Sequence, residues 1–457
     1  MPLPTVVIAG ATGFIGRWFI ERFHQSFHII ALSRSEMLPG PDYGKAEWRK
    51  VELYSLSSTE AALSGADYAV YLVHSMMPTT RLHQGDFEDT DLLLADNFGR
   101  AARANGVKQI LFMGGLLPQH ESISELSRHL RSRWEVERTL GSAGVPVTAL
   151  RAGIIVGAEG SSFQMIRKLV ERLPVLICPT WCQSATQPVE LDDALKMMKY
   201  CIGREEFYDG AFDIGGPEPT NYMAMIETVA DLLGKQRVIR PVSFFSPGFS
   251  TLWVGLFTDT SRALVAPLIE SLRHDLVAVP NPLLDAFPDR KDFRTAARRA
   301  LFGQEKLPPL PRRKKEAREK NTVRSVQRLP NPRQHTATYI ARLYQRWLPI
   351  FFRTLINVHS EEDVSIFSFA GVPLLQLQFI PDRSDDERQL FFITGGRLVR
   401  RKDYGWLEFR RVLGGKYVIS AIHEFVPALP WYLYVITQAR AHALVMNRFG
   451  RYLSGSQ

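Results

Sequence analysis

A glycine-rich turn close to the start of the chain restricts the possible folds more than any other feature. The apolar run Val6–Ala9 has the character of a buried strand and leads directly into Gly10-Ala11-Thr12-Gly13-Phe14-Ile15-Gly16. Apolar residues then recur at helical spacing, and a second apolar run follows at His28–Leu32. This order of strand, glycine turn, helix and strand predicts a parallel α/β sheet with a dinucleotide site at the turn.

Each glycine of this turn has a separate physical role. Gly10 permits the tight turn, Gly13 lets the main chain approach a pyrophosphate, and Gly16 lets the helix pack closely on the strand. Free amide groups at the start of the helix would bind the anion, helped by the helix dipole. The residues predicted to bind the cofactor here are Gly10, Thr12, Gly13, Phe14, Ile15 and Gly16.

The end of the second strand indicates which cofactor is bound. An NAD site usually has an acidic residue here for the ribose hydroxyl groups. This chain has Ser33 and Arg34, a hydroxyl and a guanidinium that suit a 2′-phosphate. We therefore expect NADP rather than NAD, with the alternative that Arg34 only points into water.

Strands and helices continue to alternate along the first 156 residues, which predicts a Rossmann-type, doubly wound parallel sheet. The further strand candidates are Trp48–Val51, Tyr68–His74, Ile110–Met113 and Val147–Leu150. A ligand of such a sheet lies beyond the carboxyl ends of the strands. This places four more residues at the cofactor crevice: Leu72, Val73, His74 and Gly114.

The chain resembles the atypical short-chain dehydrogenases/reductases, in the branch of the NmrA-like proteins and the complex I 39-kDa subunit. The resemblance covers about residues 4–303. The matching segments are Gly10–Gly16, Tyr71–Met76, Ala95–Phe98, Leu126–Arg133 and Phe212–Pro217. It implies NAD(P)H binding, and it implies that residues 157–303 form the substrate side of the same unit.

The resemblance also raises a question about catalysis. Active members of the family use a Tyr-x-x-x-Lys pair, but the matching helix of this chain has His129 and Arg133. The family's serine is replaced by the run Met113–Leu116, which has no hydroxyl. Either His129 donates the proton and Arg133 binds the ribose or phosphate, or the chemistry is lost and the nucleotide has a structural or sensory role.

The second half of the chain predicts a different architecture. Short strand candidates are followed by one long helix, Trp431–Tyr452, which predicts a smaller α+β domain. The strand candidates are Val364–Phe369, Leu374–Ile380, Gln389–Ile393, Leu398–Lys402, Trp406–Val412 and Lys416–Phe425. This part resembles the helix-grip folds of the START and polyketide-cyclase type. The predicted domains are residues 1–156, 157–303, a basic linker at 304–335, and 336–457.

The formal net charge of +9 is concentrated in one segment, Pro311–Arg328. A solvated linker explains this charge, and a peripheral contact with anionic lipid is the alternative. No nucleic-acid motif accompanies the charge, so nucleic acid is not an expected partner. The basic residues of the segment are Arg312, Arg313, Lys314, Lys315, Arg318, Lys320, Arg324 and Arg328.

Cysteine usage and hydropathy limit the location and the metal content. Cys178, Cys182 and Cys201 have no His or Cys cluster beside them that would complete a metal site, so no metal is expected. Few cysteines, no targeting segment and no long apolar run indicate a cytoplasmic protein, with a peripheral position at the inner membrane face as the alternative.

Three functions are consistent with these features. The first is an NADP-dependent reductase of a small apolar carbonyl, quinone or lipid-like compound. The second is an NADPH-binding redox sensor or assembly factor without turnover. The third is a lipid-binding or membrane-associated protein whose nucleotide domain is only structural. The glycine turn favours the first two, and the replaced tyrosine and serine favour the second over the first.

Overall fold

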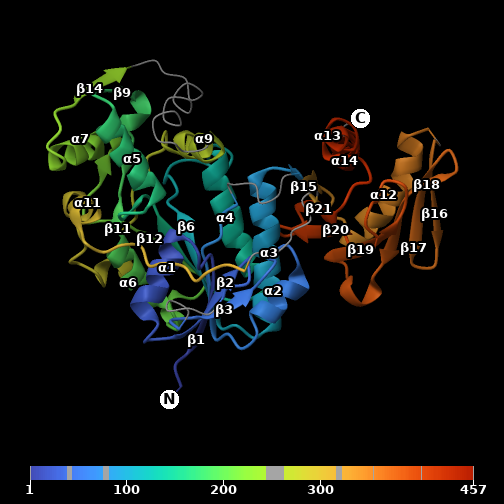
Figure 1. Cartoon of the computed structure of the whole chain (residues 1–457), viewed down its shortest axis with the longest axis horizontal. Coiled ribbons are helices and arrows are strands. Elements are labelled where there is room, and N and C mark those ends of the chain that lie inside the picture. Colours follow the sequence, from blue (N-terminus) through green and yellow to red (C-terminus); the bar gives the residue numbers. More distant parts are fainter. Residues whose placement is uncertain are drawn as a thin grey trace. The chain divides into compact units, whose positions relative to one another are not determined.

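The computed structural model describes residues 2–38, 44–75, 82–242, 262–314, 322–353, 355–402 and 404–455. The chain forms two compact units (Figure 1). Unit 1 comprises Met1–Met76 and Ala95–Lys315, and unit 2 comprises Met77–Leu94 and Glu316–Gln457. Met76 of the family motif and the basic residues Lys315, Arg318 and Lys320 lie outside the described residues.

Unit 1 contains a seven-stranded sheet in the order β12-β7-β6-β4-β1-β2-β3. All neighbouring strands are parallel. The strands are β1 Thr5–Ala9, β2 His28–Ser33, β3 Glu47–Lys50, β4 Tyr68–Tyr71, β6 Gln109–Gly115, β7 Val147–Ala152 and β12 Gly210–Ile214. This confirms the predicted Rossmann-type sheet. The edge strand β12 was not predicted, because it is short and Asp213 interrupts its apolar pattern.

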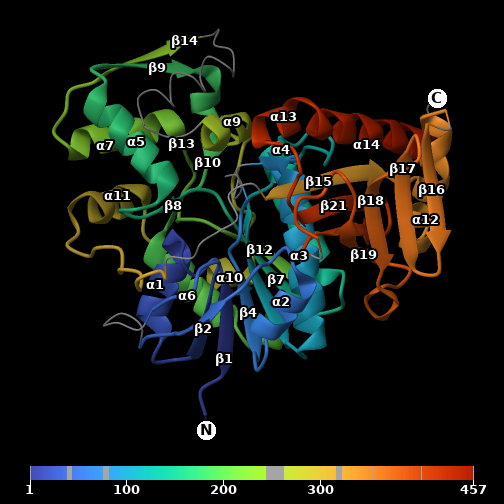
Figure 2. The same ribbon diagram turned by 45° about the vertical axis from the view of Figure 1, so that its right-hand side comes forward.

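Helices cover both faces of this sheet (Figure 2). Side chains alternate along β1: Val6 and Ile8 pack in one apolar cluster with α1 and α6, and Val7 in another with α2, α3 and α4. Burial on both faces explains why these strands are uniformly apolar. The helices are α1 Phe14–Phe23, α2 Leu56–Ala62, α3 Phe87–Ala104, α4 Arg128–Gly141 and α6 Leu191–Cys201.

The rest of unit 1 builds a second, smaller core. Phe163 and Val170 of α5 pack with Val229 of α7 and Ala297 of α11. The helices here are α5 Ser161–Arg172, η1 Thr180–Gln183, η2 Glu205–Phe207, α7 Tyr222–Leu232, α9 Arg262–Ser271, α10 Pro282–Asp285 and α11 Phe293–Phe302. The strand pairs are β8 Ile155–Val156 with β11 Val189–Glu190, β9 Val175–Pro179 with β14 Val238–Val242, and β10 Ala185–Thr186 with β13 Thr220–Asn221.

Unit 2 is an antiparallel sheet in the order β16-β17-β18-β19-β20-β21-β15, with β5 added in parallel at its edge. The strands are β5 Leu82–Gln84, β15 Val323–Pro330, β16 Ile356–Glu361, β17 Val364–Phe369, β18 Val372–Phe379, β19 Arg388–Gly395, β20 Trp406–Val412 and β21 Tyr417–Phe425. The short helix η3 Pro381–Arg383 precedes β19. Two helices, α12 Ala337–Phe351 and α14 Gln438–Ser454, contribute Trp347 and Phe449 to one core with Phe409 of β20.

This architecture confirms the predicted α+β class, whereas the helix-grip resemblance stays a prediction. Two details were wrong. Residues 398–402 form turns rather than a strand, because Gly396 with φ +113° redirects the chain after β19. The long C-terminal helix is broken into α13 Trp431–Ile436 and α14, because the backbone of Thr437 leaves the helical region at φ −116°, ψ −86°.

The predicted boundaries also change. Strand β15 lies within the predicted linker 304–335, and β5 lies within the predicted first domain yet belongs to unit 2. Arg324 and Arg328 of β15 form ion pairs with Glu424 and Asp89, the latter at 2.8 Å. Part of the positive charge that the sequence analysis assigned to a solvated linker therefore belongs to a strand, where it is paired with acidic residues.

Candidate functional site

The glycine turn joins β1 to α1 with the geometry of an anion site. Gly10 has φ +91°, and a β-carbon there would lie 2.9 Å from the β-carbon of Leu72 at the end of β4. A β-carbon at Gly16 would lie 2.5 Å from the carbonyl oxygen of Gly10. Both positions therefore require glycine, and together they bring the start of α1 against the carboxyl end of the sheet.

Gly13 differs from the other two glycines. It is exposed and precedes the first residue of α1, and its amide donates to the carbonyl of Gly10 at 2.9 Å. Within the described residues, a β-carbon at Gly13 would have only the Gly10 oxygen, at 3.2 Å, within van der Waals range. The space beside Gly13 is open, and the first amides of a helix have no partners within it. This cradle fits the pyrophosphate of a dinucleotide.

The other predicted cofactor residues lie at the same edge of the sheet. Thr12 and Ile15 are half-buried in the turn and the first turn of α1. The ring of Phe14 lies where a side chain at Gly157 would be, since a β-carbon there would be 2.6 Å from it. The half-buried residues Leu72, Val73 and His74 follow β4, and Gly114 lies near the end of β6. The structure therefore brings the predicted set to one edge.

Ser33 and Arg34, at the end of β2, differ in their exposure to solvent. Ser33 is buried, and its hydroxyl accepts a hydrogen bond from the amide of Ser35 at 3.2 Å. Arg34 is exposed. Because Ser33 is buried and Arg34 is exposed, the 2′-phosphate prediction depends on Arg34.

His129 and Arg133 lie on α4, one helical turn apart. The side chain of Arg133 is buried, and its guanidinium donates to the carbonyl oxygens of Val73 at 3.1 Å and Met113 at 2.7 Å. It also lies 4.7 Å from the ring centroid of Phe112. Arg133 thus ties together the chain after β4 and the end of β6. Its predicted contact with the ribose or phosphate stays a prediction.

The half-buried His129 meets a second histidine. Its Nδ1 lies 3.1 Å from Nε2 of His74, and the ring centroids are 5.0 Å apart. Burial lowers the pKa of His129 well below its usual value, and the neighbouring His74 and Arg133 lower it further. The ring is therefore neutral at physiological pH. If His74 donates in this pair, the proton of His129 is on Nε2, the nitrogen that remains available to a ligand.

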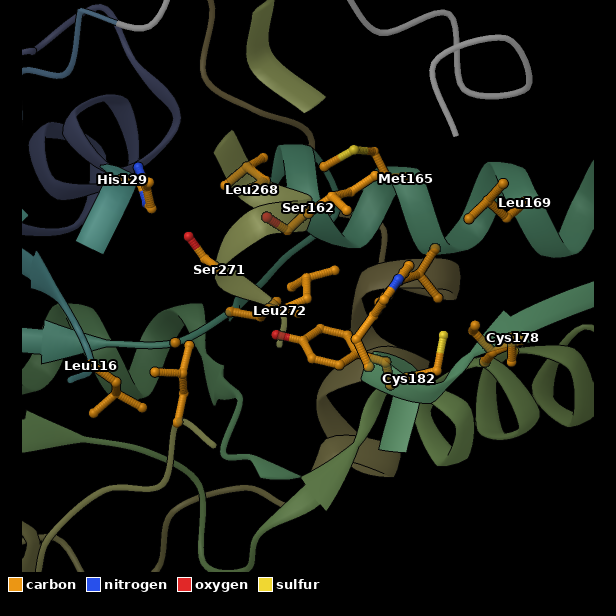
Figure 3. A pocket seen from close by; sticks show the side chains of 18 of the residues that line it. Leu116, His129, Ser162, Met165, Leu169, Cys178, Cys182, Leu268, Ser271 and Leu272 are labelled. Atoms are coloured by element: carbon orange, nitrogen blue, oxygen red, sulfur yellow. The ribbon is translucent and has the colours of Figure 1, made fainter. Parts of the chain in front are cut away.

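An apolar pocket of about 160 Å³ opens beside His129 (Figure 3). Figure 3 shows His129 on one side and Leu169, Cys178 and Cys182 on the other, with Met165, Leu268 and Leu272 between them. Other apolar side chains in the wall are those of Leu116, Leu130, Ile154, Ile166, Leu176, Ile177, Trp181, Ile226, Ile269 and Leu276. The pocket can hold a small apolar molecule with one polar group directed at the imidazole.

Two other polar residues of the pocket wall, Ser271 and Tyr222, were not identified from the sequence. Ser271 bonds Ser127, the cap of α4, at 2.8 Å, and His274 accepts from the amide of Ser127 at 3.2 Å. These contacts fix the start of the helix that carries His129. Burial raises the pKa of Tyr222 to about 12, so this phenol stays protonated. A serine at the start of a helix is the local signal that could have singled out Ser127.

The three cysteines are buried thiols. Burial raises the pKa of Cys201 to about 12, which makes it unreactive at neutral pH. Within the described ranges, no group of three or more His, Cys, Asp or Glu side chains is placed to hold a metal ion. A search of the same residues finds no helix with the length and hydropathy needed to cross a membrane.

Known proteins resemble the part of the chain that contains the glycine turn. Residues 10–170 match the family model described as NAD(P)H-binding. The auxiliary protein GraX of Staphylococcus aureus is 29% identical over 126 residues, which are 28% of this chain and 41% of that protein. The match thus spans less than half the length of this curated relative.

Solved structures show the same fold for unit 1. A nucleoside-diphosphate-sugar epimerase from Staphylococcus aureus has a TM-score of 0.52 at 17% identity, covering 65% of this chain and 100% of that chain. The Citrobacter sp. triphenylmethane reductase complexed with NADP(H) has a TM-score of 0.50 at 15% identity, covering 65% and 99%.

The Escherichia coli NADPH-dependent quinone oxidoreductase complexed with NADPH has a TM-score of 0.50 at 17% identity, covering 64% of this chain and 98% of that chain. These identities support the shared fold and no finer assignment. Residues 10–170 are therefore similar to the NAD(P)H-binding family, and unit 1 shares the fold of these two reductases and of the epimerase.

Proposed function

We propose that unit 1 is an NADP(H)-dependent reductase of a small apolar carbonyl compound or quinone. The apolar pocket beside His129 carries this proposal, because it lies next to the carboxyl edge of the sheet where the cofactor residues gather. Two structural neighbours, the triphenylmethane reductase and the quinone oxidoreductase, are described with NADP(H) and NADPH.

The cofactor end of the site is formed mainly by main chain. The amides at the start of α1 and the space beside Gly13 would hold the pyrophosphate. Arg34 would pair with the 2′-phosphate, because it is exposed at the end of β2 and no acidic side chain takes its place there. The cradle would accept either dinucleotide, and Arg34 would favour NADP(H) over NAD(H).

The substrate end would be formed by the apolar wall and one histidine. The wall excludes water and favours an uncharged ligand. Nε2 of His129 would donate a hydrogen bond to the substrate oxygen, provided that Nδ1 accepts from His74. A neutral imidazole is not repelled by Arg133, and its hydrogen bond would stabilise negative charge that develops on that oxygen.

The reaction balances with these groups. Bound NADPH would supply the hydride for this reduction, held by the glycine turn and Arg34. As Nε2 of His129 gives its proton to the substrate oxygen, Nδ1 would take the proton that His74 donates, so that His129 stays neutral and solvent restores the proton of His74. Arg133 contributes by position, since its bonds to Val73 and Met113 hold the strand ends that surround the imidazole.

The experiment has two stages. Purified protein is first tested for binding of NADPH and NADH, and oxidation of NADPH is then followed against a panel of apolar quinones and aldehydes. Met165→Trp, which fills the pocket, should abolish oxidation and keep NADPH binding. Met223→Trp is the matched control, because Met223 is a half-buried methionine of α7 outside the pocket.

A non-catalytic NADPH sensor is the second candidate. It is favoured by the loss of the family's tyrosine, lysine and serine and by the pairing of His129 with another protein side chain. NADPH binding without oxidation by any compound of the panel would support the sensor and overturn the reductase.

A further inference from the structure

Helix α13 of unit 2 has its apolar side chains directed outward. Its exposed residues are Trp431 at 39%, Tyr432 at 56%, Leu433 at 37%, Val435 at 40% and Ile436 at 55% relative exposure. Tyr434 is the buried member of this helix, packed with Val323, Phe425 and Ala439. One tyrosine thus packs α13 on the sheet, while the five other side chains of the helix are 37–56% exposed.

This arrangement differs from that of an ordinary surface helix, which buries its apolar stripe. Trp431 and Tyr432 combine an apolar body with a polar end, the character of side chains that gather at membrane–water interfaces. The aliphatic residues beside them, Leu433, Val435 and Ile436, suit the apolar side of that interface. A short helix with this composition is suited to lie in the plane of a bilayer surface.

The next helix continues the surface with positive charge. The exposed residues Arg440, Leu444 and Arg448 of α14 are spaced four apart and therefore share one face. Arg451 and Tyr452 extend this face toward the end of the helix. No Asp or Glu follows Glu424 in the sequence. Figure 2 shows α13 and α14 end to end.

A basic loop lies against the residues that lead into α13. The amide of Arg400 donates to the carbonyl of Val426 at 2.9 Å, and the amide of Ala428 donates to that of Leu398 at 2.9 Å. The loop has four exposed basic residues, Arg397, Arg400, Arg401 and Lys402. The acid Asp403 follows them in the sequence and lies outside the described residues.

We infer that α13, the exposed face of α14 and the loop 397–402 form a binding site for an anionic membrane surface. Positive charge without acidic neighbours on the helices matches anionic lipid, and the exposed aromatic and aliphatic side chains match the bilayer interface. The site is independent of the reductase proposal. It also differs from the basic segment 311–328, where Arg324 and Arg328 pair with acidic residues.

The test is sedimentation of the full chain with vesicles of phosphatidylcholine, with and without phosphatidylglycerol. Wild type should bind the phosphatidylglycerol vesicles at low salt and bind less as salt rises. The variant Tyr432→Ser/Val435→Ser/Ile436→Ser should bind at least about tenfold more weakly at every salt concentration. The variant Arg400→Ser/Arg401→Ser/Lys402→Ser should lose about tenfold at low salt and little at high salt.

Two controls make these results specific. Ile350→Ser/Leu355→Ser removes apolar side chains of unit 2 that are 75% and 57% exposed but lie elsewhere, and it should bind like wild type. Arg312→Ser/Arg313→Ser/Lys314→Ser tests the segment in unit 1 and should also bind like wild type. Circular dichroism and NADPH binding check that each variant is folded.

Three results would overturn the inference. The first is wild type that ignores anionic vesicles at low salt. The second is equal loss of binding in the Ile350/Leu355 control and in the α13 variant. The third is self-association that depends on α13 without vesicle binding, which would assign the surface to a protein interface.

Discussion

The glycine turn and helix α4 lie at the same edge of one parallel sheet, yet they present different chemistry. At the turn, Gly10 and Gly16 have no room for side chains, so the main chain itself faces the ligand. On α4, Arg133 is occupied by two main-chain carbonyls and His129 by His74. The proposed cofactor site therefore depends on backbone shape, whereas any chemistry depends on how one imidazole is held.

The largest effect is expected from blocking the turn. In Gly13→Val the side chain would occupy the open space where the pyrophosphate has to lie, so NADPH affinity should fall by at least about 100-fold, or ~2.7 kcal/mol. Isothermal titration calorimetry measures this directly. The thermal stability should change little, because among the described residues a β-carbon at Gly13 meets only the Gly10 oxygen, at 3.2 Å. Unchanged affinity in the folded variant would remove the turn from the cofactor site.

Removing the imidazole of His129 should have the next largest effect. It should lower turnover, which depends on α4, without lowering cofactor affinity, which depends on the glycine turn. We expect His129→Ala to lower turnover by about 100-fold, the usual scale for loss of a positioned proton donor. NADPH affinity should be retained, because the turn is unchanged. The split between kcat and cofactor binding is the readout. Turnover that survives the substitution would exclude His129 from the mechanism.

Arg133→Met should lower the stability of the fold. The variant keeps His129 but leaves the carbonyls of Val73 and Met113 without their guanidinium, so we expect a loss of about 2–3 kcal/mol in the free energy of unfolding. Denaturant unfolding of wild type and variant gives this difference. A variant as stable as wild type that has lost NADPH affinity would instead assign Arg133 to the ribose or phosphate.

Arg34→Ala should produce a smaller and selective effect. Loss of one charge-assisted contact is worth about 1–3 kcal/mol, so NADPH affinity should fall while NADH affinity stays nearly constant. Parallel titrations with the two nucleotides measure this. Equal losses for both would contradict the 2′-phosphate contact.

The smallest effect concerns pH. The pKa of His129 is lowered by burial, so the ring is neutral in the folded and the unfolded chain above pH ~6.5 and contributes no pH dependence there. Below that value the unfolded chain takes up a proton that the fold excludes, and stability falls as the pH falls. His442, whose pKa burial lowers to about 4, acts in the same direction.

Unfolding free energies at pH 7 and pH 5 should therefore differ less in His129→Gln and His442→Gln than in wild type. A pH dependence that is the same in wild type and both variants would show that these rings are already charged in the fold.

Local patterns made unit 1 largely predictable. The strand, turn and helix around Gly10–Gly16 lie within one short stretch of sequence, and burial on both faces makes each central strand uniformly apolar. The pocket was less visible, because its wall comes from α5, β9, η1, α7 and α9, whose residues also look like ordinary core. The His74–His129 pair joins residues 55 positions apart and had no local signal.

Unit 2 was predictable only in part. Most of its strands were predicted as short runs separated by turn signals, but β5 lies far from the other strands in sequence and pairs with β15. Burial of Arg324 beside Glu424 cannot be inferred from a run of charges, because the partner comes from a strand about one hundred residues away. Pairings of this kind are decided by the tertiary fold rather than by local sequence.

The central claim is that the pocket beside His129 receives a compound that is reduced by bound NADPH. The most direct measurement is a single-turnover experiment, in which NADPH-saturated protein is mixed with an apolar quinone and the absorbance of NADPH is followed. We expect rapid oxidation in wild type, oxidation about 100-fold slower in His129→Ala, and no oxidation in Met165→Trp. Tight NADPH binding with no oxidation in wild type, or equal rates in all three proteins, would contradict it.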